Sequence, residues 1–174
     1  MNLDLSGKNA FVCGSTQGIG RAAAHELANL GAQVTLVARN AEKLEAVRAA
    51  LPTVQGQQHR TLAADFSRPG DLQKVLEAFL AEHGEAVHIL VNNTGGPPAG
   101  PAHKAQLEEF RTAFNQHLVC NQVLVQALLP RMQSAGYGRI INVISTSVKQ
   151  PLNNLGVSNT IRGAVANWAK TLAN

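Results

Sequence analysis

The chain has 174 residues, of which 45% are hydrophobic and 15% are charged, and at roughly 150 residues per domain this length favours one domain with a buried core. Its apolar runs fall far short of the roughly 20 residues that a membrane-spanning helix needs, so we expect no membrane partner. The net charge is +4, but the Lys and Arg residues are scattered and aromatic residues are few, which disfavours nucleic acid as a partner.

Short apolar, β-branched segments alternate along the chain with longer amphipathic ones. This alternation is typical of βαβ units, and the near-continuous hydrophobicity of the short segments is typical of strands that are covered on both faces. The pattern predicts strands at residues 9–13, 33–38, 59–64, 87–92 and 139–145, and helices at residues 18–30, 41–51, 69–83, 107–135 (continuous or broken) and 153–174. We therefore predict an α/β fold with a doubly wound, Rossmann-like parallel sheet.

A glycine-rich segment follows the first predicted strand and opens the first predicted helix. Residues 13–20 read Cys-Gly-Ser-Thr-Gln-Gly-Ile-Gly. Glycines let the backbone turn tightly and approach a pyrophosphate, and the helix N-terminus offers free N–H groups to the anion. A P-loop is excluded because Ile19 stands five residues after Gly14 and no Lys-Ser/Thr pair follows. The alternative is a tight turn without a ligand. The expected cofactor contacts are Gly14, Ser15, Thr16, Gly18, Ile19 and Gly20.

The second predicted strand ends in Ala38-Arg39-Asn40, where a fold specific for NAD carries a carboxylate for the ribose 2′-hydroxyl. The guanidinium of Arg39 can instead pair with a 2′-phosphate, which favours NADP(H), with Asn40 beside it. The alternative is a solvated arginine that begins a helix.

Two further segments follow strands on the same predicted edge of the sheet. Asp65 and Phe66 come after the third strand, where the carboxylate either accepts a hydrogen bond from an adenine amine or caps a turn. Residues 92–96 read Asn-Asn-Thr-Gly-Gly after the fourth strand. Here Asn92 and Gly95 are expected to contact a cofactor, and the Asn side chains can also tie neighbouring strand ends together.

These motifs together resemble the short-chain dehydrogenase/reductase family: Gly14-x-x-x-Gly18-x-Gly20, Asp65, Asn-Asn-x-Gly at 92–95, and Gly-Arg-Ile-Ile-Asn-Val-Ile-Ser at 138–145. The resemblance runs over essentially the whole chain and is closest to the 3-oxoacyl-acyl-carrier-protein reductase-like members, which reduce a ketone with NADPH. It implies an NADP(H)-dependent oxidoreductase that acts on a small carbonyl or alcohol substrate. It also implies a homodimer or homotetramer assembled through the helices at 107–135 and 153–174.

The resemblance further implies a catalytic set of Ser, Tyr, Lys and Asn, and three of these four identities differ here. Ser145 matches the Ser position, Ser158 stands thirteen residues later at the Tyr position, and Arg162 stands four residues further at the Lys position. An aliphatic hydroxyl is a much weaker acid than a phenol, so Ser158 does not simply replace Tyr, whereas Arg162 keeps a positive charge for a cofactor ribose. His117 occupies the Asn position and is a candidate proton donor with an ordinary pKa near 6.5. Packing against a neighbour such as Asn121 is the alternative.

Two functions therefore remain for residues 1–174, which we expect to form a single dinucleotide-binding domain. One is hydride transfer with NADP(H), and the other is cofactor binding or a scaffold role without turnover. The family continues past the last predicted helix with further strands, so we expect the domain to be incomplete at its C-terminus. The first residues lack the features of a secretory leader, which favours a cytoplasmic location. Cys13 and Cys120 show no metal-ligand spacing, so we expect buried thiols and no metal site.

Overall fold

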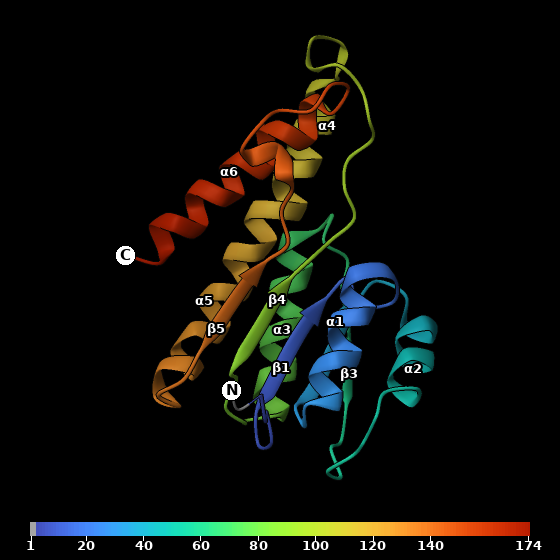
Figure 1. Cartoon of the computed structure of the whole chain (residues 1–174), viewed down its shortest axis with the longest axis vertical. Helices are drawn as coiled ribbons and strands as arrows, with labels where there is room; N and C mark the ends of the chain where they lie inside the picture. Colours follow the sequence, from blue (N-terminus) through green and yellow to red (C-terminus); the bar gives the residue numbers. More distant parts are fainter. Residues whose placement is uncertain (1–2) are drawn as a thin grey trace.

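The computed structural model describes residues 3–174 and contains one parallel sheet flanked by helices (Figure 1). The strands of these residues lie in the order β3-β2-β1-β4-β5, and each pairs in parallel with its neighbours. The strand bounds are β1 (Asn9–Cys13), β2 (Gln33–Ala38), β3 (Arg60–Ala63), β4 (Ile89–Asn92) and β5 (Arg139–Asn142). The strand order reverses between β1 and β4, which makes this a doubly wound sheet. The predicted Rossmann-like α/β fold is confirmed.

Helices fill the connections between the strands. Their bounds are α1 (Gly18–Asn29), α2 (Ala41–Ala49), α3 (Pro69–Glu82), α4 (Leu107–Phe114), α5 (Cys120–Ser134) and α6 (Gly156–Leu172). Figure 1 shows α4 and part of α6 beyond the carboxyl ends of the strands, at the top of the view. Across residues 3–174, no helix is both long and apolar enough to cross a bilayer.

Each face of the sheet packs against its own helices, because successive side chains of a strand point to opposite faces. Phe11 and Cys13 of β1 face α3 and α5, where they contact a cluster that includes Leu72 and Leu124. The alternate residues of β1 face α1 and α2 in a second cluster, which includes Ala10, Val12, Ala24, Ala28 and Leu44. The buried face of α1 consists of small residues, so this helix lies close to the sheet.

The segment predicted as a helix at 107–135, continuous or broken, is helical but changes its hydrogen-bond pattern part-way along. Helix α4 ends at Phe114, five residues form a π-helical turn η2 (Asn115–Val119), and α5 then begins without a loop. A π-helical turn inserts an extra residue into an α-helix and is frequent at functional sites. It rotates the side chains that follow, and it leaves His117 buried.

Three strands and the last helix are shorter than predicted. The prediction of a strand over 139–145 was wrong at its end, because β5 pairs with β4 only up to Asn142, where β4 itself ends. The strands predicted at 59–64 and 87–92 are likewise shorter, as Arg60–Ala63 and Ile89–Asn92, because their pairing with β2 and β1 begins only at Arg60 and Ile89. The helix predicted from residue 153 begins at Gly156, because Asn154 has a φ of 60° and takes part in a loop instead.

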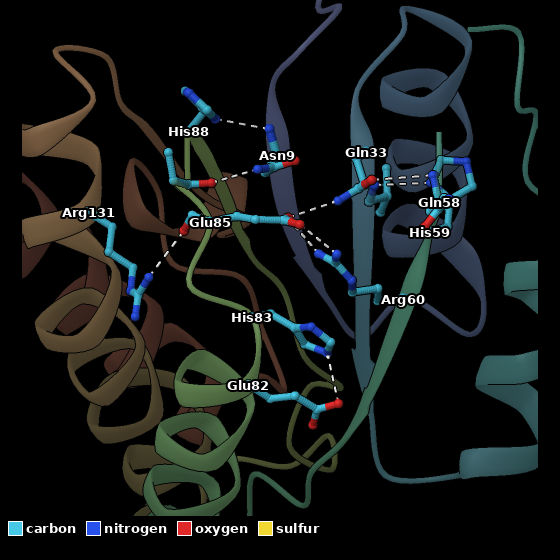
Figure 2. A network of polar contacts seen from close by, with 12 residues as sticks. Asn9, Gln33, Gln58, His59, Arg60, Glu82, His83, Glu85, His88 and Arg131 are labelled. Atoms are coloured by element: carbon cyan, nitrogen blue, oxygen red, sulfur yellow. Dashed lines mark hydrogen bonds and ion pairs between the residues drawn. The ribbon is translucent and has the colours of Figure 1, made fainter. Parts of the chain in front are cut away.

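A polar network joins the strands at their amino-terminal ends, away from the edge that the motifs share (Figure 2). Glu85 accepts two hydrogen bonds from the guanidinium of Arg60, at 2.6 and 2.7 Å, and one from the side chain of Gln33 at 3.1 Å. The backbone carbonyl of Glu85 accepts a further bond from Arg131 of α5 at 3.1 Å. The network therefore ties β2, β3, α5 and the approach to β4 together and leaves the opposite edge of the sheet free.

Candidate functional site

A cleft of about 440 Å³ opens at the carboxyl ends of the strands, beside the position where the strand order reverses. Doubly wound sheets bind their ligands at this position. The cleft is lined by residues of the turns after β1, β2, β3 and β4 and of the π-helical turn: Gly14, Thr16, Gln17, Gly18, Ile19, Val37, Ala38, Arg39, Ala64, Asp65, Phe66, Asn93, Thr94, Gly95, Gly96 and Gln116.

The turn between β1 and α1 has a shape that only glycine fits at two positions. Gly14 has a φ of +59°, a conformation that side-chain-bearing residues rarely adopt. At Gly20 the conformation is ordinary, but an added Cβ would lie 2.3 Å from the carbonyl oxygen of Gly14. The first turn of α1 therefore lies directly on the preceding strand end. The N-cap residue Gln17 makes no side-chain cap, which leaves N–H groups at this helix end for a ligand.

Asn93 holds this turn against the end of β4. Its Nδ2 donates to the carbonyl oxygens of Cys13 and Gly14, at 3.2 and 3.4 Å. A Cβ at Gly14 would lie 2.7 Å from the same nitrogen. Asn93 thus links the two strands on either side of the reversal and shapes the floor of the cleft.

One charged side chain of each sign lines the cleft beyond β2 and β3. Arg39 is exposed at the end of β2. Asp65 accepts a hydrogen bond from the backbone N–H of Ser67 at 2.9 Å, and this bond is the main reason that the pKa of Asp65 lies below its ordinary value. Nearby Arg68 and Arg39 lower the pKa further. Asp65 therefore caps a turn and also presents a carboxylate to the cleft.

A second group of polar side chains surrounds the end of β5. Ser145 caps a short 3-10 turn η3 (Thr146–Val148) by accepting a hydrogen bond from the N–H of Ser147 at 3.1 Å. Arg162 of α6 donates from Nη1 to the carbonyl oxygen of Val143 at 2.8 Å. Ser158 lies half-buried one helical turn before Arg162, and within the described residues no hydrogen bond joins it to Ser145.

His117 lies in the π-helical turn with 2% of its surface exposed. Burial, the positive charge of Arg162 and a partly compensating hydrogen bond with the backbone of Gly95 bring its pKa to about 4. The ring is therefore neutral at pH 7. The pKa of this ring lies below the 6.5 of an imidazole in water, because the ring is enclosed beside a cation.

Residues 8–174 match the family described as short chain dehydrogenase. The chain belongs to this family. It is 31% identical to L-sorbose reductase from Gluconobacter frateurii, crystallised with NADPH and L-sorbose; the two superpose with a TM-score of 0.91 over 99% of this chain and 65% of that one. It is 36% identical over 172 residues to oxidoreductase asL5 from Sarocladium schorii, which covers 97% of this chain and 67% of the relative.

A third relative is very-long-chain 3-oxoacyl-CoA reductase-A from Danio rerio, 34% identical over 170 residues that cover 95% of this chain and 52% of that protein. The resemblance found in the sequence is thus confirmed, and a 3-oxoacyl reductase is among the matches. The chain spans between about half and two thirds of the length of these relatives.

Several of the residues predicted as cofactor contacts have structural roles in the part of the chain that the structure describes. The buried Ser15 donates from Oγ to the carbonyl of Val37 at 3.4 Å, and Asn40 caps α2 by accepting from the N–H of Lys43 at 2.8 Å. Asn92 donates to the side chain of Asn142 at 2.9 Å and so joins β4 to β5.

The remaining predicted contacts either line the cleft or, as Gly20 and Arg162 do, border it. Sequence reasoning missed eight lining residues: Gln17, Asn93, Thr94, Gly96, Val37, Ala38, Ala64 and Gln116. The first four stand inside the motifs and could have been found there. Gln116 carries no such signal, because its position depends on the π-helical turn.

The single tyrosine of the chain lies away from the cleft. Tyr137 precedes β5, and its ring lies 4.7 Å from both the ammonium of Lys8 and the guanidinium of Arg139, measured to the ring centroid. These partners belong to the amino-terminal edge of the sheet. No phenol is therefore present at the end of β5 to act as an acid.

Proposed function

We propose that this chain forms a dinucleotide-binding domain that holds NADP(H) in the cleft and serves hydride transfer between that cofactor and a carbonyl or alcohol substrate. The observation that carries the proposal is that Arg39 and the glycine turn line the same cleft. Arg39 lies where a fold that prefers NAD has a carboxylate, and a guanidinium there matches a 2′-phosphate. The NADPH in the L-sorbose reductase structure supports the same cofactor.

The residues of the cleft fit a dinucleotide on their own geometry. Gly14 and Gly20 let the start of α1 lie against the end of β1, where a Cβ would clash with the protein itself. At Gly18 an added Cβ would meet nothing within 4 Å, so a pyrophosphate can approach the backbone beside the start of α1. Arg39 would bind the 2′-phosphate, and Asp65 would accept from the adenine amine while keeping its cap. The backbone of Gly95 and Gly96 would border the other half of the dinucleotide. Bound there, the reduced cofactor supplies a hydride to a carbonyl carbon.

Reduction of a carbonyl also requires a proton for the carbonyl oxygen, and the residues at the catalytic positions are weak proton donors. Ser145 can orient the carbonyl, because its hydroxyl retains a free hydrogen while its oxygen accepts from Ser147. Ser158 is an aliphatic alcohol, and the neutral ring of His117 lacks the proton of an imidazolium at pH 7. We therefore expect slow turnover.

This lack of a proton donor favours a second candidate function, which is cofactor binding without turnover. Steady-state oxidation of NADPH with a panel of short ketones and 3-oxoacyl thioesters separates the two. Rates above the background of protein-free buffer support the reductase, whereas saturable NADPH binding without any turnover supports the second function.

The double substitution Ser158→Tyr with Arg162→Lys tests the assignment of the catalytic positions. A tyrosine whose pKa is lowered by a lysine one turn away would restore an acid near neutrality, so ketone reduction should rise by at least about tenfold, given that general acid catalysis contributes 10²–10⁴-fold. The single substitution Ser158→Phe is the control, because it adds the ring without the acid. Equal rates in the double variant and the control would refute the assignment.

We also propose that the chain self-associates through the helices of its α4–α6 side. Leu107 and Phe114 of α4 are 73% and 42% exposed, and Phe114 lines a groove that reaches Ile161 of α6. Contacts between copies would remove this apolar surface from water. Sedimentation should show a dimer or tetramer at micromolar concentration, and Phe114→Lys should shift it toward the monomer. A wild-type monomer would contradict the proposal.

A further inference from the structure

Arg162 is a half-buried cation whose charge is not compensated within the described residues. Its Nη1 donates to the carbonyl of Val143 at 2.8 Å, which satisfies one of five N–H groups. Between residues 3 and 174 no carboxylate pairs with it, and burial alone lowers its pKa. Removing a charge from water without an opposite partner costs free energy. A bound anion would offset this cost by pairing with the guanidinium.

The guanidinium borders the open end of the cleft. A Cβ placed on Gly96 would come within 4.0 Å of Nη2 of Arg162, and one placed on Gly95 would meet nothing within that distance. Both glycines line the cleft. A ligand bound along the Gly95–Gly96 backbone would therefore lie within reach of Nη2 of Arg162.

His117 is a buried polar group near enough to Arg162 for the guanidinium charge to lower its pKa. Its Nε2 has no hydrogen-bond partner within the described residues, and 2% of the residue is exposed. The turn that carries it packs against α3, α4, α5 and α6, and of the charged groups on these helices Arg162 is the one whose charge acts on the ring. The pair therefore presents positive charge and no negative charge at this end of the cleft.

We propose that Arg162 is an anion-binding residue and that the substrate of this site carries a carboxylate, as a 2-oxo or 3-oxo acid does. The proposal rests on the proposed function, since it names the substrate class of the same site. A carboxylate accepts two parallel N–H bonds from a guanidinium, and here it would be held next to the position where Ser145 follows β5. His117 responds to this binding, because an anion on Arg162 removes the repulsion that disfavours the protonated ring.

The test compares acetoacetate with its uncharged methyl ester at constant ionic strength, each titrated in the presence of saturating NADP⁺ and in its absence. Wild type should bind acetoacetate at least about tenfold more tightly than the ester, the lower end of what a hydrogen bond to a charged group contributes. Arg162→Gln should reduce the ratio to about one, and Arg162→Lys should keep most of it. Arg139→Gln, which removes an exposed arginine at the other end of β5, should leave it unchanged.

A second readout follows the ring of His117 by NMR. Its pKa should rise when acetoacetate is added to wild type or to Arg162→Lys, and it should not respond in Arg162→Gln. An arginine that only supports the fold would give no such response in any of the three proteins.

Equal affinities for acetoacetate and its ester in wild type would overturn the proposal, whether or not the Arg162→Gln variant folds. A preference that survives in a folded Arg162→Gln protein would also overturn it. Weaker NADP⁺ binding by that variant with an unchanged acetoacetate preference would assign Arg162 to a cofactor phosphate, again against the proposal. Failure of wild type to bind NADP⁺ would refute the proposed function itself, and the arm without NADP⁺ then still decides the role of Arg162.

Discussion

Replacing Gly20 by alanine tests whether the glycine turn has the shape described above. The added Cβ would lie 2.3 Å from the carbonyl oxygen of Gly14, 2.8 Å from its carbonyl carbon and 2.8 Å from Nδ2 of Asn93. Ordinary contacts begin near 3.4 Å. Two of the three atoms belong to the backbone, so the clash is relieved only if α1 moves away from the end of β1.

Such overpacking destabilises a fold by about 1–3 kcal/mol, and the better helix propensity of alanine offsets at most about 1 kcal/mol of this. We therefore expect Gly20→Ala to lower the free energy of unfolding by about 1–2 kcal/mol, which shifts the urea midpoint by roughly 0.5–1 M. Because the movement displaces the N–H groups of α1, the affinity for NADPH should fall by at least about tenfold.

The matched control is Gly163→Ala in α6, where an added Cβ meets nothing within 4 Å. This change should raise stability by about 0.5–1 kcal/mol through helix propensity alone. Urea unfolding followed by circular dichroism measures both variants, and NADPH fluorescence measures the affinity of Gly20→Ala. An unchanged midpoint together with unchanged NADPH affinity in Gly20→Ala would refute the described contact between α1 and the turn.

The remaining predictions concern buried titratable groups. The folded-state pKa of His117 is about 4 against about 6.5 when unfolded, so the unfolded chain binds the proton more readily, and about 3 kcal/mol of stability present above pH 6.5 is lost progressively as the pH falls toward 4. His117→Gln should remove this part of the slope in urea titrations at pH 5 and pH 7; identical slopes for variant and wild type would contradict the burial of the ring. Burial also raises the pKa of Cys13, and raises that of Cys120 to about 12, so neither thiol should react with a disulfide reagent at pH 8 until the chain is unfolded in urea. Rapid labelling of the native protein would show that one of them is accessible.

The part of this structure that follows from local pattern was predictable from the sequence. The alternation of apolar strands and amphipathic helices predicts the parallel sheet, because only crossover helices can connect parallel strands over such spacings. Gly14 and Gly20 were also predictable from local sequence, because a tight turn that joins a strand directly to a helix favours residues without side chains. Arg39 could be located because it directly follows a predicted strand.

The features that depend on contacts distant in sequence were not predictable. Asn93 binds the carbonyls of Cys13 and Gly14, and nothing in its local sequence distinguishes it from Asn92, whose side chain instead turns to β5. The lowered pKa of His117 arises from burial and from Arg162 on another helix. The π-helical turn that places Gln116 in the cleft packs against helices α3, α4, α5 and α6, and these contacts cannot be read from residues 115–119 alone.

A fluorescence titration of wild type and Arg39→Asp with NADPH and with NADH tests whether the cleft at the ends of β1 and β4 is an NADP(H) site whose preference comes from Arg39. Wild type should bind NADPH saturably and at least about tenfold more tightly than NADH, and Arg39→Asp should lose or reverse that preference, because the carboxylate repels the 2′-phosphate and accepts from the 2′-hydroxyl. Binding of neither cofactor, or a preference for NADPH that persists in Arg39→Asp, would contradict the claim.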